Sequence, residues 1–250
     1  MLCRWQAEGF KLNTHHLRRS DGHCSLTFGC DAIDFKRVLG LADGGWLSGQ
    51  SIDTYAAWLM MQQCCVDVTD DLGAMDRIKQ NEVPAEAIYF NTATPMFFNK
   101  FDAAGMPVLW LDNEFKQAVR QAKVLMLIDN IDKCHWCLYI VDKAKLEAVV
   151  YEPSAHVWDD TRMKAFLAFL SKLTGESVYD DCKIKIVYGG TVGGFPKQPD
   201  SHTCGIFACI ILTHFLLNAT LNLPMQASAL SLLLKRWRKF IAYKSKTVFD

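Results

Sequence analysis

The sequence predicts an α+β fold, with a central, mostly antiparallel sheet flanked by helices. Between residues 123 and 152, short segments rich in Val, Ile, Leu and Tyr follow one another with brief connections, which favours antiparallel pairing. Segments with apolar residues at helical spacing stand before and after this block. Of the 250 residues, 50% are hydrophobic and 22% are charged, so the chain can bury a core of this kind.

The first expected helix covers residues 46–63. Ser48 is suited to be its N-cap, and Trp46 stands just before the helix starts. Its inward face consists of apolar residues at helical spacing, namely Ile52, Tyr55, Ala56 and Leu59. Trp46 is therefore expected at the mouth of this helix.

Three further helices are expected. One lies near residues 112–121, and another covers residues 159–175 and ends at Gly175. The apolar run of residues 205–223 nearly reaches the length of a membrane span but is interrupted by polar residues. A buried core helix is the better interpretation of this run.

Four strands are expected, over residues 123–129, 135–142, 146–152 and 183–189. A loop at residues 142–145 would pair Val141 with Leu146 and bring His135 directly opposite Glu152. A one-residue change in register would make these two residues diagonal neighbours. In both registers the imidazole and the carboxylate meet at one end of a two-stranded ribbon, and a surface His–Glu pair is the alternative interpretation.

Charge and segment composition limit the kinds of partner. The chain has 27 Lys and Arg and 27 Asp and Glu, so no overall field would draw it to nucleic acid or to an anionic membrane. The first 20 residues lack the order of a signal peptide, and we expect an intracellular protein of the nucleus or cytoplasm. Residues 1–40 show no clear periodicity and are interpreted as an extension, with one folded domain over residues 41–250.

Most of the ten cysteines are expected to be reduced and buried. Cys134 and Cys137 form a conspicuous C-x-x-C pair. Residues three apart in a strand point to opposite faces, so these two thiols are poorly placed to share a zinc ion or a disulfide. No second pair stands at zinc-ligand spacing, and we expect no metal site.

Cys204 is the candidate nucleophile because it stands at the entrance to the apolar helix. Amide groups and the dipole at a helix N-terminus stabilise a thiolate. Gly205 directly after it would let another part of the chain approach closely. Gln198, a little upstream, can donate a side-chain hydrogen bond to a developing oxyanion, together with the backbone N–H of Cys204.

These motifs resemble those of the ubiquitin-like-protein-specific (SUMO/sentrin-type) cysteine proteases and the related adenovirus-type proteinases. The resemblance rests on the order of His135-Trp136, an acid after the next strand, Gln198 and Cys204-Gly205, and it spans roughly residues 40–220. The segment WLSGQSIDTY at residues 46–55 is similar to an upstream motif of the family.

Two positions depart from the SUMO-protease pattern. Glu152 replaces the usual Asp and is closer to the adenovirus-type pattern, and Gly49 stands where SUMO proteases usually carry Asp. The identity of the substrate is therefore left open by the sequence.

The resemblance implies a papain-like thiol protease with its nucleophile at a helix N-terminus. His135 would take the proton of Cys204, Glu152 would orient His135, and Gln198 would help to hold the oxyanion. The resemblance also implies a narrow channel for a Gly-Gly tail, walled by two aromatic side chains, Trp46 and Trp136. Residues 41–250 would then form the catalytic domain.

The expected partner is a protein substrate, either a ubiquitin-like protein or its conjugate, or a polyprotein. No cofactor, metal, nucleic acid or membrane is implied, and a monomer is expected. Three alternatives remain open at this stage. They are an adenovirus-type polyprotein protease, an acetyltransferase that uses the same His–Glu–Cys site, and a non-catalytic binding module.

Overall fold

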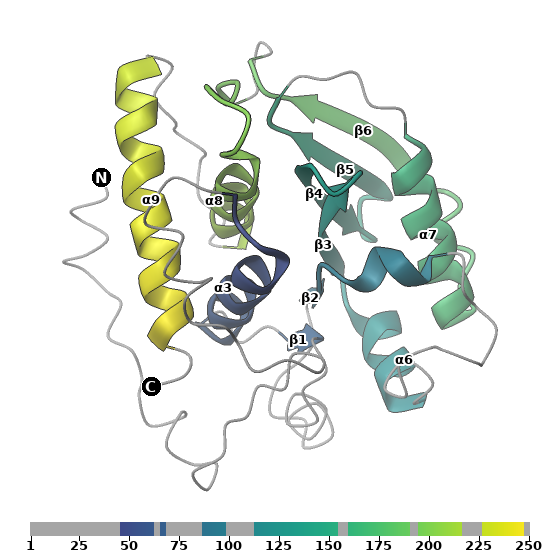
Figure 1. Cartoon of the computed structure of the whole chain (residues 1–250). Helices are drawn as coiled ribbons and strands as arrows, with labels where there is room; N and C mark the ends of the chain where they lie inside the picture. Colours follow the sequence, from purple (N-terminus) through teal and green to yellow (C-terminus); the bar gives the residue numbers. More distant parts are fainter. Residues whose placement is uncertain are drawn as a thin grey trace, which may run out of the picture.

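A computed structural model of the chain is shown in Figure 1. It describes residues 46–62, 66–68, 87–98, 113–154, 160–190, 195–216 and 227–247. The expected extension over residues 1–40 lies outside these described residues.

The described helices are α3 (Gly49–Gln62), α6 (Asn113–Gln121), α7 (Thr161–Thr174), α8 (Cys204–Leu216) and α9 (Ala227–Thr247), with a short 3₁₀ helix η2 (Thr94–Phe97). The strands are β1 (Val66–Val68), β2 (Ala87–Phe90), β3 (Val124–Ile131), β4 (His135–Asp142), β5 (Glu147–Glu152) and β6 (Lys183–Tyr188). The helices and strands expected from the sequence are all present, and most lie within a few residues of the expected bounds. Helix α8 ends at Leu216, and the last expected residues of this run, 217–223, lie outside the described residues. Helix α9, the short helix η2 and strands β1 and β2 were not expected.

The strands form one six-stranded sheet in the order β1-β2-β3-β4-β5-β6. The expected α+β class is confirmed, and β3, β4 and β5 form the expected antiparallel meander. The expectation of a mostly antiparallel sheet is corrected, because the β1–β2, β2–β3 and β5–β6 pairs are parallel. The chain between β2 and β3 contains α6 and the chain between β5 and β6 contains α7, so both connections are long enough to return to the same end of the sheet.

Helices cover both faces of the sheet. Figure 1 shows α3, α8 and α9 on one side and α6 and α7 on the other. Alternate side chains of β4 feed the two cores: Trp136 and Leu138 join the core under α8, and Cys137 and Tyr139 join the core under α7. Helix α8 is buried over ten consecutive residues, as expected for a core helix. Among the described residues, no helix is both long and apolar enough to cross a membrane.

The predicted ends of two helices are confirmed. Ser48 Oγ accepts a hydrogen bond from the backbone N–H of Ser51 at 3.2 Å, which caps the first turn of α3. Helix α7 ends at Gly175, whose φ of 73° is in the left-handed region that glycine adopts readily. Trp46, two residues before Ser48, is 44% exposed.

The register of the β4–β5 hairpin differs from the predicted one. Val141 pairs with Ala148 rather than with Leu146, because the loop covers residues 143–146 and Asp142 closes the ladder with Glu147. Leu146 takes a positive φ of 52° at the end of this loop. The shift of two residues keeps every side chain on its predicted face.

The shift also changes which residue lies across from Glu152. Tyr151 pairs with Leu138, so the next position along the ladder places Glu152 across from Cys137. His135 is therefore a diagonal neighbour of Glu152 rather than its direct partner.

Candidate active site

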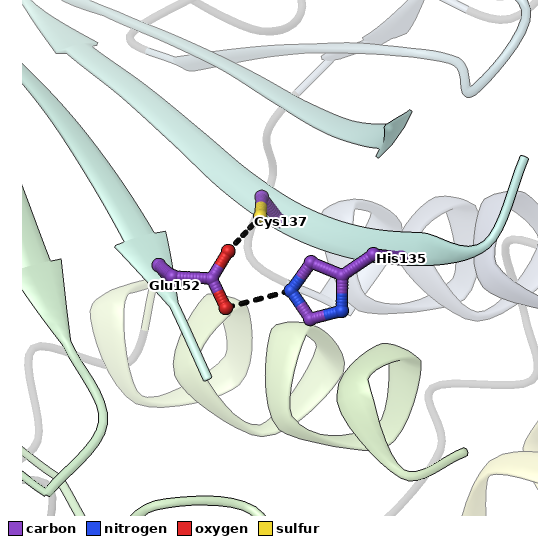
Figure 2. A group of neighbouring side chains, drawn as sticks. All are labelled: His135, Cys137 and Glu152. Carbon is purple, nitrogen blue, oxygen red and sulfur yellow. Dashed lines mark hydrogen bonds and ion pairs between the residues drawn. The ribbon is translucent and has the colours of Figure 1, made fainter. Parts of the chain in front are cut away.

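His135 and Glu152 meet where β4 begins and β5 ends (Figure 2). A tight turn, in which Asp132 and Lys133 both take positive φ values, ends directly before His135 and fixes the start of the strand. His135 Nε2 lies 2.7 Å from Glu152 Oε1. His135 is 6% exposed and Glu152 is fully buried, so this contact is shielded from water.

Glu152 accepts hydrogen bonds on both carboxylate oxygens. Oε1 accepts from His135 and also from the backbone N–H and the hydroxyl of Ser154, both at 2.6 Å. Oε2 accepts from the thiol of Cys137 at 3.0 Å. Burial raises the pKa of Glu152, but the hydrogen bonds from His135, Cys137 and Ser154 and the charge of His135 outweigh it and lower the pKa below the ordinary value. Glu152 is therefore an anion at neutral pH.

Cys204 is the first residue of α8 and is fully buried. Its thiol lies close enough to His135 to help raise the pKa of the imidazole. Because Nε2 of His135 is engaged by Glu152, Nδ1 is the ring nitrogen left to meet the thiol. The three residues predicted as nucleophile, base and acid are thus brought together, with His135 between Cys204 and Glu152.

The protonation of His135 is set by these two partners. Burial lowers its pKa, but the hydrogen bonds with Cys204 and Glu152 and the negative charge of Glu152 act in the other direction and raise the pKa to about 9. The imidazole is therefore protonated at neutral pH. An imidazolium between a carboxylate and a helix N-terminal cysteine is the arrangement that favours a reactive thiolate.

The loop before α8 holds the start of the helix in place. Asp200 Oδ1 accepts the backbone N–H groups of His202 at 2.9 Å and of Thr203 at 2.8 Å. A Cβ atom on Gly205 would lie 3.1 Å from Leu47 Cβ and 3.1 Å from Trp136 Cδ1. The predicted close approach at Gly205 is therefore observed, and it lets the start of α8 pack against the segment before α3.

Gln198 is 8% exposed and lies beside the end of β5. Its backbone N–H donates to the carbonyl of Pro153 at 2.9 Å, which ties this loop to the residue after Glu152. Its side-chain Nε2 donates to the Asp200 carbonyl at 2.5 Å, and its buried Oε1 has no hydrogen-bond partner among the residues that the structure describes. Because an amide nitrogen carries two hydrogens, Nε2 retains one for an oxyanion.

The two candidate channel residues differ in exposure. Trp136 is 3% exposed, and its indole N–H donates to the Leu47 carbonyl at 3.1 Å. Trp46, the residue before Leu47, is 44% exposed. The backbone of residues 46–47 therefore passes over Trp136 and leaves the Trp46 ring at the surface.

Cys137 and Ser154 complete the site and were not predicted from the sequence. Cys137 is on the same face of β4 as His135, two residues away, and this spacing is the signal that could have pointed to it. Burial, followed by the charge of Glu152, raises the pKa of Cys137 well above its ordinary value, so it remains a thiol. Cys134 is exposed and its Sγ contacts the Ile131 carbonyl at 3.5 Å, whereas Cys137 is buried. The two cysteines of the C-x-x-C pair therefore do not act on one ligand or on each other.

His135, Cys137 and Glu152 also have the ligand types of a transition-metal site. Their ligand atoms lie within 4.8 Å of one another, and all three side chains are buried. The carboxylate already accepts four hydrogen bonds from His135, Cys137 and Ser154. A metal ion would have to break the His135–Glu152 contact, so this arrangement fits proton chemistry better than metal binding.

The chain is similar to known proteins in sequence and in fold. A family model described as the Ulp1 protease family, C-terminal catalytic domain, matches residues 107–244. None of the curated proteins compared with the chain matches it significantly.

Solved structures share the fold at low identity. The Ulp1 protease domain in complex with SMT3, the yeast ortholog of SUMO, has a TM-score of 0.57 and 14% identity, covering 85% of this chain and 81% of that chain. The Chaetomium thermophilum Ulp1-like SUMO protease catalytic domain has a TM-score of 0.54 and 13% identity, covering 87% and 91%. A SUMO protease Ulp1 structure with its catalytic cysteine oxidised to a sulfonic acid has a TM-score of 0.55 and 16% identity, covering 85% and 83%.

Proposed function

Because the chain belongs to the Ulp1 protease family and is a cysteine-type peptidase, we propose that it cleaves after the Gly-Gly-type tail of a ubiquitin-like protein. It would process the precursor of that protein or release it from conjugates. The observation that carries this proposal is the buried 2.7 Å contact between His135 and Glu152, beside Cys204 at the start of α8. The SUMO proteases that share the fold support the choice of a protein substrate.

In the proposed reaction, the proton of the Cys204 thiol has already passed to His135, so the attack starts from a thiolate beside the imidazolium. The thiolate attacks the carbonyl carbon of the scissile bond, and the negative charge moves to the carbonyl oxygen. The backbone N–H of Cys204 and the remaining Nε2 hydrogen of Gln198 stabilise this oxyanion. The imidazolium then gives its proton to the leaving amine, and a thioester remains on Cys204.

Hydrolysis of the thioester uses the same groups in reverse. His135 takes a proton from water, and the resulting hydroxide attacks the thioester carbonyl. Collapse of the second oxyanion releases the product as a carboxylic acid, which loses its proton to solvent, and returns the thiolate beside the imidazolium. Glu152 stays ionised throughout, holds Nε2 of His135, and stabilises its positive charge.

The remaining assignments belong to the same proposal. Trp46 and Trp136 would wall a narrow channel in which only residues without side chains fit, which favours a Gly-Gly tail. Residues 41–250 would form the catalytic domain, acting as a monomer, with residues 1–40 as an extension. The protein would work in the nucleus or cytoplasm without a cofactor.

Cleavage of a panel of precursors tests this proposal. Each precursor is a ubiquitin-like protein, either SUMO, NEDD8 or ubiquitin, with a short peptide after its Gly-Gly end. The expected result is a mature product ending in Gly-Gly from at least one precursor, and no product with the Cys204→Ala variant. If none is cleaved and a polyprotein-type peptide is, the adenovirus-type alternative replaces this function. Acetyl transfer from acetyl-CoA through Cys204 would instead favour the acetyltransferase alternative.

A further inference from the structure

The two oxygens of the Glu152 carboxylate are held unequally. Oε1 accepts three hydrogen bonds, one from His135 Nε2 and two from Ser154. Oε2 accepts one, from the thiol of Cys137 at 3.0 Å. Cys137 is therefore the single donor to Oε2 among the described residues, and Figure 2 shows the Glu152 carboxylate facing both Cys137 and His135 on the neighbouring strand.

The ladder of the hairpin creates this contact. Leu138 pairs with Tyr151, so the next position along the antiparallel pair sets Cys137 across from Glu152 on the same face. Both side chains are fully buried. A buried carboxylate oxygen loses its hydrogen bonds to water. If no protein donor replaces them, the folded state is destabilised.

The last torsion of a glutamate side chain is broad, so the rotamer alone does not fix the plane of the carboxylate. Donors on both oxygens do fix it. Ser154 holds Oε1 from the chain after β5, and Cys137 holds Oε2 from β4, the strand that also carries His135. Two anchors from different elements define one orientation, in which Oε1 faces His135 Nε2.

We propose that Cys137 is a positioning residue, whose thiol holds the Glu152 carboxylate in the orientation that directs and polarises His135. The proposal rests on the assignment of His135, Glu152 and Cys204 as base, acid and nucleophile. It gives the second cysteine of the C-x-x-C pair a role in the reaction without any covalent or metal chemistry. Cys137 remains a thiol at working pH, because burial and the charge of Glu152 oppose its ionisation.

Substitutions at Cys137 separate donation from packing. Cys137→Val fills the space without a donor, and Cys137→Ala removes both the donor and the volume. Both are expected to lower kcat about tenfold and to change KM less than about twofold, since one hydrogen bond is lost away from the substrate. Cys137→Ser keeps an O–H donor and is expected to stay within about threefold of the wild-type kcat.

A matched control comes from Cys209, which is also a fully buried, free thiol. Cys209→Ala removes the same atoms from another part of the core. Its thermal midpoint is expected to fall, as for Cys137→Ala, while kcat stays within about twofold of wild type. If Cys137→Ala fails to fold, the comparison of Cys137→Val with Cys137→Ser provides the same test.

A double-mutant cycle identifies the residue through which Cys137 acts. In a Glu152→Ala background, Cys137→Val is expected to change kcat by less than about twofold, because the group that it positions is absent. A full tenfold loss in that background would overturn the proposal, and so would a Cys137→Ser variant as slow as Cys137→Val. Lack of turnover by the wild-type chain on every precursor would instead contradict the proposed function, so the two failures are distinguishable.

Discussion

Two buried carboxylates of this protein receive similar hydrogen bonds and respond in opposite ways. Glu152 accepts from His135, Cys137 and Ser154, and its pKa is lowered. Asp53 of α3 accepts from the Tyr89 hydroxyl at 2.9 Å and from the backbone and hydroxyl of Thr92 at 2.9 and 2.7 Å. Its pKa is nevertheless raised to about 7, because burial outweighs these hydrogen bonds.

The difference lies in the charge of the partners. Within the described part of the chain, the donors to Asp53 are the neutral groups of Tyr89 and Thr92, so no positive charge there compensates for the lost hydration of the ion. Glu152 has an imidazole that can carry a positive charge at 2.7 Å, and that charge stabilises the anion. Asp53, which has only neutral donors, therefore has a structural role and connects α3 to the end of β2. Glu152, which has a titratable partner, is suited to catalysis.

Replacing Glu152 by Gln and Asp53 by Asn should give the largest difference in kcat between the two sites. Glu152→Gln removes the charge that holds the imidazolium, and we expect kcat to fall by about 10²- to 10⁴-fold. Asp53→Asn keeps the acceptor for Tyr89 and should change kcat by less than about threefold. Steady-state kinetics on the best precursor measures both. A comparable loss of kcat in the two variants would remove the distinction between them.

Truncation of Asp53 should affect folding rather than chemistry. Asp53→Ala leaves Tyr89 and Thr92 without their acceptor in a buried site, which should lower the free energy of unfolding by about 3 kcal/mol. The folded fraction should retain its kcat. Urea unfolding followed by fluorescence gives the free energy, and active-site titration with a Cys204 reagent normalises the kinetics. A selective loss of kcat at unchanged stability would contradict the structural role.

The two sites should also lose stability over different pH ranges. Asp53 binds its proton more tightly in the folded state, so its contribution falls as pH rises from 3.8 to about 7. The raised pKa of His135 gives a contribution that is complete below pH 6.5 and is lost as pH rises to about 9. At about 1.4 kcal/mol for each pKa unit, each contribution should be on the order of 3 to 4 kcal/mol.

Unfolding free energies between pH 4 and about 9.5 measure this separation. Asp53→Asn should flatten the lower range, and Glu152→Gln should make the upper range shallower, because Glu152 helps to raise the pKa of His135. If either variant changed the pH dependence of stability equally in the lower and the upper pH range, the two sites would titrate together.

A smaller effect is expected at the rim of the site. Trp46 is 44% exposed, so Trp46→Ala should lower stability by less than about 0.5 kcal/mol while raising KM about fivefold, if the ring contacts the substrate tail. Trp136→Ala serves as the contrast, because a 3% exposed ring in the core under α8 should cost about 3 kcal/mol or more of stability. An unchanged KM in Trp46→Ala would remove Trp46 from the channel.

The sequence was sufficient to predict the meeting of His135 and Glu152, although its register was wrong by two residues. A shift by two keeps faces unchanged, so the prediction survived an error in the loop at residues 143–146. The contact of Cys137 with Glu152 depends on that register and could not be predicted. The alternation of side chains along the strand predicted that Cys137 and Cys134 lie on opposite faces. It did not predict which residue Cys137 contacts.

Other features depend on contacts between distant parts of the chain. Asp53 reads as one polar residue in an amphipathic helix, and its burial follows from Tyr89 and Thr92, more than 30 residues away. Strands β1 and β2 have only 3 and 4 residues and carry too little pattern to be recognised. Their parallel pairing depends on the sheet that they join.

Mapping of a covalent adduct tests whether Cys204 is the nucleophile and whether Glu152 supports its reactivity. SUMO, NEDD8 and ubiquitin, each with a thiol-reactive group in place of the last residue, are incubated with the wild-type protein, and the adduct is located by peptide mass spectrometry. We expect one adduct, on Cys204, with at least one of the three probes, and a slower reaction in Glu152→Gln. An adduct on another cysteine, or equal rates in wild type and Glu152→Gln, would contradict this expectation.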